Sequence, residues 1–177
     1  MPSEAVWAEA SSLVLPSAAA TQSLAALIGQ RAEPGLVILL EGNLGSGKTT
    51  FVQGLGQGLG IPEPIDSPTF VLVQEYHTGR IPLFHCDLYR LESAATEDLG
   101  LEELWNRDGI TAIEWSQYLS DLPTAYLWLH LKPHPHPEGS RLLQVRGQGS
   151  QPAQLWQQVL SQLARQNPPE KGIRLIS

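Results

Sequence analysis

One short segment of the chain has residue types and a spacing suited to holding the phosphate groups of a nucleotide. It reads Gly-Asn-Leu-Gly-Ser-Gly-Lys-Thr from Gly42 to Thr49, which matches the pattern G-x-x-x-x-G-K-[ST]. In this pattern glycines permit a tight turn whose N–H groups face one anion, and the lysine reaches the β- and γ-phosphates. We therefore predict that Lys48 acts on phosphate and that the Thr49 hydroxyl binds Mg²⁺. The other loop residues predicted to contact the nucleotide are Gly42, Leu44, Gly45, Ser46, Gly47 and Thr50.

The residues on either side of this segment predict the strand and helix that a phosphate-binding loop requires. Residues 35–41 form a continuous apolar run typical of a buried strand, and residues 47–59 predict a helix, although its glycines weaken it. The N-terminus of such a helix directs N–H groups and a positive dipole end at the same phosphates. The alternative is a chance match in a chain with 16 glycines, and the context argues against it. Because no Asn-Lys-x-Asp motif for reading guanine is present, we expect ATP rather than GTP.

Two acidic residues are candidates for the carboxylate that a magnesium site of this kind needs, usually at the end of a buried strand. Glu114 ends the largely apolar segment 110–114, and Asp87 ends the predicted strand 81–87. We predict catalytic roles for both and metal binding for Glu114. The alternative for each is a strand-end carboxylate that caps the backbone or is simply solvated.

A Ser-Pro-Thr sequence lies between the predicted helix and the next strand, where switch segments of nucleotide-binding proteins often lie. Its last residue, Thr69, is a candidate for sensing the γ-phosphate or the metal. On the residues alone, a plain turn that enters a strand is the simpler interpretation.

The remaining periodicities predict alternating strands and helices. A helix is expected over 18–31, with Ser17 or Thr21 as a candidate N-cap. Further strands are expected over 69–76, 81–87, 109–115, 125–131 and 141–145, and further helices over 92–105 and 151–165. The pattern predicts a single α/β domain of the P-loop NTPase-like type over 1–165, with a mixed, mostly parallel sheet flanked by helices and antiparallel edge strands. Residues 166–177 are expected to be a loosely ordered C-terminal tail.

Length, charge and cysteine content exclude several classes of protein. The 177 residues suffice for one domain with a core and are too few for two ordinary domains. The formal net charge of −7, from 11 basic and 18 acidic residues, disfavours direct binding to DNA or RNA. A single cysteine, Cys86, excludes an internal disulfide. No apolar run is long enough to span a membrane and the start lacks a basic region, so we expect a cytoplasmic protein.

Four motifs in series carry a resemblance to a known family. They are Gly-Asn-Leu-Gly-Ser-Gly-Lys-Thr-Thr-Phe at 42–51, Ser-Pro-Thr-Phe at 67–70, His-Cys-Asp-Leu-Tyr-Arg at 85–90 and Ile-Glu-Trp at 113–115. Together they resemble TsaE, the bacterial ATPase of tRNA threonylcarbamoyladenosine (t6A) biosynthesis, over about 14–145. One departure is Cys86, where the family usually has Phe or another large apolar residue, and it raises a question about local packing.

The resemblance implies a role for each matching residue. Lys48 and Thr49 become the phosphate and Mg²⁺ residues, and Thr69 becomes a switch I residue. Asp87 becomes a switch II residue important for hydrolysis. Glu114 becomes the second residue of the magnesium site, with Trp115 packed beside it.

The resemblance also implies partners and two further nucleotide contacts. Pro16, ahead of the first helix, and Arg141, after the late turn, align with positions near the nucleotide. The resemblance implies that the partners are TsaB and TsaD, the pair that transfers the threonylcarbamoyl group to adenosine 37 of tRNA. A TsaE-like ATPase would bind that pair and reset it between turnovers. The acidic balance suits this, because the partner would hold the tRNA.

Two other functions remain compatible with the motifs. A small-molecule kinase usually needs an arginine-rich lid, and no arginine cluster follows the predicted core. A nucleotide-gated binding module would bind ATP without hydrolysing it, which the complete set of Lys48, Thr49, Asp87 and Glu114 argues against.

Overall fold

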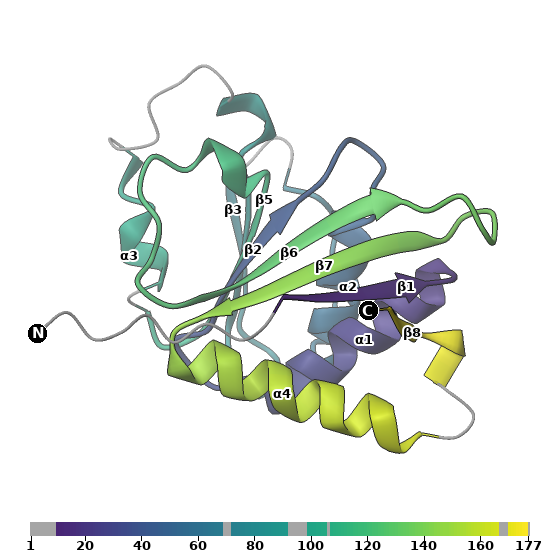
Figure 1. Cartoon of the computed structure of the whole chain (residues 1–177). Coiled ribbons are helices and arrows are strands. Elements are labelled where there is room, and N and C mark those ends of the chain that lie inside the picture. Colours follow the sequence, from purple (N-terminus) through teal and green to yellow (C-terminus); the bar gives the residue numbers. More distant parts are fainter. Residues whose placement is uncertain (1–9, 69–71, 92–98, 106, 167–169, 177) are drawn as a thin grey trace, which may run out of the picture.

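The computed structural model describes residues 10–68, 72–91, 99–105, 107–166 and 170–176, which fold into one α/β domain (Figure 1). An eight-stranded sheet forms its centre. The strands are β1 (Ser11–Leu15), β2 (Val37–Glu41), β3 (Val73–Tyr76), β4 (Leu83–Asp87), β5 (Ile110–Glu114), β6 (Tyr126–Pro133), β7 (Arg141–Gln148) and β8 (Arg174–Ile176). The α-helices are α1 (Ala18–Arg31), α2 (Lys48–Gly58), α3 (Glu102–Trp105) and α4 (Ser150–Arg165). In the described part of the chain, every helix is too short or too polar to cross a bilayer.

The sheet is parallel at its centre and antiparallel on both sides. Its strand order is β3-β4-β5-β2-β6-β7-β1-β8. The pairs β4–β5, β5–β2 and β2–β6 are parallel, whereas β3–β4, β6–β7, β7–β1 and β1–β8 are antiparallel. The predicted antiparallel edges are therefore confirmed, but the expectation of a mostly parallel sheet was wrong. The reason is the long β6–β7 hairpin, which carries two further antiparallel strands on its outer side.

Most of the predicted elements have counterparts in the described residues. Helix α1 has the predicted bounds, and the Ser17 side chain caps it by accepting a hydrogen bond from the Ala20 N–H at 3.1 Å. Of the helix expected over 92–105, residues 92–98 lie outside the described part, and only Glu102–Trp105 is α-helical within it. Of the strand expected over 69–76, residues 69–71 also lie outside it.

The two ends of the described chain form strands that periodicity did not predict. Strand β1 pairs with β7 on one side and with β8 on the other. Part of the segment expected as a loose tail is therefore built into the sheet. Ile173 is buried in the core immediately before β8, which explains why the segment docks there.

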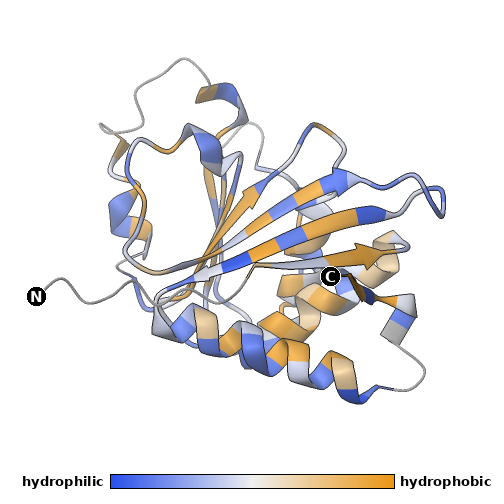
Figure 2. Ribbon diagram, in the orientation of Figure 1, coloured by the Kyte–Doolittle hydropathy of each residue, from blue (hydrophilic) through white to orange (hydrophobic). Residues whose placement is uncertain are grey.

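Each face of the sheet has its own core, and strand burial follows from this arrangement. One core gathers residues of α1, α2 and α4, and the other lies on the opposite face beside α3. Strand β2 is buried on both faces, which matches its continuous apolar run. Figure 2 shows hydrophobic and hydrophilic residues alternating along β6 and β7, where one face is better covered than the other.

The glycines that weaken the helical pattern of α2 have a packing role. A β-carbon at Gly54 would lie closer than van der Waals contact to the backbone of Gln22 in α1, and one at Gly58 would do the same against Ala26. Helix α2 therefore carries glycine where it meets α1, because no side chain fits between the two backbones. This close packing fixes the position of the helix that follows the candidate phosphate loop.

We predict that Gly54→Ala lowers the free energy of unfolding, although alanine is the better helix former by about 1 kcal/mol. The added methyl group must push two helix backbones apart, and such overpacking costs about 1–3 kcal/mol. Urea denaturation followed by circular dichroism measures the change. Gln57→Ala, at an exposed position of the same helix, is the matched control and should not lower stability. A more stable Gly54→Ala variant would show that helix propensity outweighs the contact.

Candidate functional site

The loop between β2 and α2 has a backbone that only glycine accommodates at key positions. Gly42 has φ 148° and Gly47 has φ 106°, both in the region that disfavours other residues. A β-carbon at Gly42 would also meet the carbonyl oxygen of Leu131 at 2.5 Å. The loop turns directly into α2, whose N-cap residue Gly47 has no side chain to cap the first N–H groups. These groups are the donors that a helix N-terminus offers to an anion.

The loop forms one wall of a cleft with a volume of about 380 Å³. Segments from α2, β4, β5 and the chain before β3 complete it. The lining residues are Leu44, Gly45, Ser46, Gly47, Lys48, Thr49, Thr50, Ser67, Asp87, Tyr89, Glu114 and Trp115. The cleft thus brings the predicted loop residues from Leu44 to Thr50 together with both predicted carboxylates, whereas Gly42 is not among its lining residues.

The two carboxylates meet because β4 and β5 are parallel neighbours that end at the same level. Asp87 pairs in register with Glu114, and both are the last residues of their strands. Ligand crevices of open α/β sheets lie outside the carboxyl ends of parallel strands, which is where this cleft lies.

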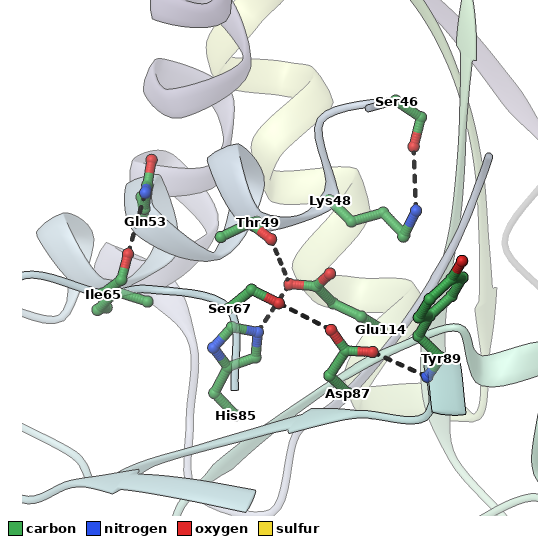
Figure 3. Close-up of polar contacts among 10 residues, drawn as sticks. All are labelled: Ser46, Lys48, Thr49, Gln53, Ile65, Ser67, His85, Asp87, Tyr89 and Glu114. Carbon is green, nitrogen blue, oxygen red and sulfur yellow. Dashed lines mark hydrogen bonds and ion pairs between the residues drawn. The ribbon is translucent and has the colours of Figure 1, made fainter. Parts of the chain in front are cut away.

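Glu114 is the residue on which the polar contacts of the cleft converge (Figure 3). Its side chain is buried, and its Oε1 accepts a hydrogen bond from the Thr49 hydroxyl at 2.9 Å. Nε2 of the fully buried His85 lies 2.8 Å from the same oxygen. The predicted metal ligands Thr49 and Glu114 are therefore in direct contact.

Among the described residues, Asp87 accepts a hydrogen bond from each of two groups. The Ser67 hydroxyl donates to Oδ2 at 2.8 Å, and the backbone N–H of Tyr89 donates to Oδ1 at 2.9 Å (Figure 3). Ser67 lies in the Ser-Pro-Thr sequence, so the described part of that sequence does contact the site. Thr69 itself lies outside the described residues.

The Lys48 ammonium is buried at the inner end of the cleft. It donates to the carbonyl oxygens of Gly42 at 2.6 Å and Asn43 at 3.0 Å, and it lies 4.2 Å from the ring centroid of Trp115. Burial lowers the pKa of Lys48 from its ordinary value, and the negative charges of Glu114 and Asp87 partly oppose that shift. The ammonium thus lies near enough to both carboxylates to offset their charge.

Trp115 has an unusual backbone for a large residue. Its φ of 59° and ψ of 42° place it in the left-handed region, which costs a bulky side chain about 1–3 kcal/mol. The turn directs its ring between Tyr89, at a centroid distance of 4.9 Å, and Tyr118, at 5.9 Å. Tyr89 and Trp115 line the cleft together with Lys48 and Glu114, and Tyr118 stacks on Trp115.

Three residues predicted to contact the nucleotide, Gly42, Pro16 and Arg141, are not among those that line the cleft. Arg141, at the start of β7, donates from Nε to the Ser46 carbonyl at 2.9 Å and from Nη2 to the Gly45 carbonyl at 3.2 Å. It therefore supports the loop from behind. Pro16 precedes α1 and makes no described polar contact with the loop.

Residue-by-residue reasoning gave no role to three residues that the structure brings to the site: Ser67, His85 and Tyr89. The signal for His85 was strand alternation, because Leu83, His85 and Asp87 share one face of β4. The hydrogen bond from Tyr89 is donated by its backbone N–H, so the type of residue at this position does not predict it. Ser67 was visible only as part of a turn sequence.

Cys86 lies between His85 and Asp87 but belongs to the opposite core. It is fully buried among apolar residues that include Val37, Leu39 and Ile113. Burial, reinforced by the charges of Asp87 and Glu114, raises the pKa of the thiol to about 12. The small side chain at this position therefore fills a core site and is not a reactive group.

We predict that Cys86 resists alkylation by iodoacetamide at pH 8 in the folded protein, because the thiolate is the reactive form and is scarce far below the pKa. Mass spectrometry counts the modified chains over time. The same protein in guanidinium chloride is the control and should be alkylated completely. Rapid modification of the folded protein would contradict the burial of the thiol.

The sequence matches a protein-family model described as "Threonylcarbamoyl adenosine biosynthesis protein TsaE" over residues 15–141. The matched range includes the 42–49 loop, Asp87, Glu114 and Arg141. It ends before most of β7 and before α4 and β8.

Individual relatives and a solved structure agree with this match. The tRNA threonylcarbamoyladenosine biosynthesis protein TsaE of Nostoc sp. is 54% identical over 111 residues, covering 60% of this chain and 68% of the relative. The Bacillus subtilis protein of the same name is 43% identical over 113 residues, covering 63% and 71%. The crystal structure of Bacillus subtilis YdiB has a TM-score of 0.75 and 29% identity, and the alignment covers 89% of this chain and 97% of that one.

Proposed function

The chain belongs to the TsaE family of threonylcarbamoyladenosine biosynthesis proteins, and on this premise we propose that it is a Mg²⁺-dependent P-loop ATPase of tRNA t6A modification. The observation that carries the proposal is the contact between Thr49, at the start of α2, and Glu114, at the end of β5. It joins the hydroxyl of a phosphate-loop motif to a buried strand-end carboxylate, as a nucleotide-bound Mg²⁺ requires.

The donor set fits Mg²⁺. Magnesium prefers oxygen ligands and is usually held by one or two carboxylates together with the phosphates of its substrate. The described residues contain no group of three or more His, Cys, Asp or Glu side chains that could hold a metal. We therefore do not propose a site in which the protein alone supplies all the metal ligands. The Thr49 hydroxyl donates a hydrogen bond to Glu114, which leaves the lone pairs of the hydroxyl oxygen for a cation. Thr49 and Glu114 would hold the metal, which neutralises phosphate charge when bound.

The 42–49 loop would bind the phosphates of ATP. Its N–H groups and the uncapped N-terminus of α2 favour an anion, and Lys48 adds a positive charge. Lys48 now donates to loop carbonyls and lies in the cleft, so a phosphate oxygen would replace one of those acceptors. Arg141 would keep the loop in shape without contacting the phosphates.

Asp87 would act in the hydrolytic step by orienting the attacking water. The carboxylate lines the cleft beside Glu114, but Ser67 and the Tyr89 N–H both donate to it. Phosphoryl transfer depends on positioning and charge neutralisation, and switch segments are often ordered by a partner. We therefore expect slow hydrolysis by the chain alone.

The partner in this proposal is a TsaB–TsaD complex, with tRNA contacted only through it. ATP binding and hydrolysis by this chain would reset the partner complex between turnovers. The net charge of −7 supports an indirect relation to tRNA, because an acidic surface repels the phosphate backbone.

We predict that Lys48→Ala weakens ATP binding by about 10-fold to 150-fold, since a hydrogen bond to a charged group contributes about 1.5–3 kcal/mol. Titration calorimetry with Mg²⁺ and a non-hydrolysable ATP analogue measures the affinity. Lys132→Ala, which removes an exposed lysine outside the cleft, is the matched control and should bind like the unmodified protein. Equal affinities for the analogue in all three proteins would show that Lys48 and its loop do not bind the phosphates.

The experiment that tests the proposed function measures phosphate release from ATP and Mg²⁺, with and without the cognate TsaB–TsaD pair. We expect a low rate alone and a clear rise with the pair. Bound ATP without phosphate release in either case would favour a binding module. Turnover that requires a small acceptor and produces ADP with a phosphorylated product would favour a kinase.

A further inference from the structure

We propose that His85 is a positioning residue that fixes the Glu114 carboxylate for metal binding, a role that rests on the proposed function. The inference starts from the location of a buried imidazole. His85 has no exposed surface, and the only side chain that its ring is described as contacting by a hydrogen bond is Glu114. Its effect on the reaction would therefore pass through that carboxylate.

The register of β4 and β5 explains how the ring reaches Glu114. In these parallel strands Leu83 pairs with Ile110, His85 with Ala112 and Asp87 with Glu114. All six residues belong to alternate positions, so their side chains share one face of the sheet. The small side chain of Ala112 leaves room beside Glu114, and the imidazole fills that room. A large apolar residue in place of Ala112 would occupy the space through which the imidazole reaches Glu114.

The hydrogen bond has a defined direction. A carboxylate only accepts, so Nε2–H of His85 donates to Oε1 of Glu114 at 2.8 Å. The other ring nitrogen, Nδ1, has no hydrogen-bond partner among the residues that the structure describes. The contact with Glu114 therefore fixes which ring nitrogen carries the donated hydrogen, namely Nε2.

The two donors around Glu114 use the same oxygen. Thr49 and His85 both donate to Oε1, and Figure 3 shows the second carboxylate oxygen turned away from the imidazole. Thr49 and Glu114 would both contact the metal. Of these three residues, His85 alone would serve only to hold the carboxylate. Partners of this kind orient a ligand, and their loss typically costs about 10–100-fold in metal affinity.

A packing role alone would not need an imidazole at this position. Leu83 and Ile110, one step earlier on the same face, are apolar and belong to the core. Leucine at position 85 would continue that core and would carry no polar atom to satisfy. The histidine is therefore explained by its hydrogen bond and not by its volume.

The test compares His85→Leu, which removes the donor, with His85→Gln, whose side-chain amide offers an N–H near the position of Nε2. Fluorescence of an N-methylanthraniloyl ATP analogue reports nucleotide affinity in EDTA and during a MgCl₂ titration. His77→Leu, an exposed histidine of the β3–β4 turn outside the cleft, is the matched control. Thermal unfolding of each variant is recorded in parallel.

We expect His85→Leu to raise the half-saturating Mg²⁺ concentration about 10–100-fold while leaving the affinity in EDTA unchanged. His85→Gln should restore most of the Mg²⁺ response, and His77→Leu should match the unmodified protein. In a Glu114→Gln background, His85→Leu should add no further shift, because its effect passes through the carboxylate.

Three results would overturn the inference: an unchanged Mg²⁺ response in His85→Leu, an equal loss of affinity in EDTA and Mg²⁺, or no recovery in His85→Gln. The proposed function fails separately. If the unmodified protein binds the analogue equally well in EDTA and Mg²⁺, or does not bind it, the magnesium site itself is wrong before any variant is compared.

Discussion

The buried carboxylate of Glu114 sets a constraint that much of the site's arrangement satisfies. An unpaired charge at this depth costs several kcal/mol, about the scale of a domain's net stability. Two hydrogen bonds offset the cost here, one from Thr49 in α2 and one from His85 in β4. The carboxylate therefore connects the helix after the glycine-rich loop to the parallel centre of the sheet. Close α1–α2 packing and the in-register ends of β4 and β5 hold those donors in place.

The glycine-rich loop is held from two directions by cations. Lys48 donates to loop carbonyls from the cleft side, and Arg141 donates to Gly45 and Ser46 from β7. Within the loop, the Ser46 N–H donates to the Asn43 carbonyl at 3.0 Å, and a tight turn of this kind suits anion binding by its other N–H groups. The Arg141 contact links the start of β7 to a loop almost a hundred residues earlier, so the antiparallel half of the sheet also shapes the site.

How much of this could be read from the sequence depends on whether the signal was local. The apolar run of β2, the Ser17 cap of α1 and the loop pattern are local, and the structure has each of them where predicted. The positions of Asp87 and Glu114 at strand ends were also readable, because alternation and apolar runs mark where those strands stop. Strands β1 and β8 could not be predicted from the sequence, since a short strand depends on pairing with a distant partner. His85 and Arg141 act through such distant contacts, so the sequence offered His85 only as part of a motif and Arg141 only as a position that aligns near the nucleotide.

The most direct test of the shared Thr49–Glu114 site is to titrate Mn²⁺, as a paramagnetic substitute for Mg²⁺, into the protein with a non-hydrolysable ATP analogue. Electron paramagnetic resonance then measures free and bound Mn²⁺. If Thr49 and Glu114 hold the cation, a single Mn²⁺ binds per chain in a nucleotide-dependent manner, and Thr49→Val abolishes that binding while the fold is retained. Equal Mn²⁺ binding by Thr49→Val would contradict the site, because its hydroxyl would then have no part in holding the metal.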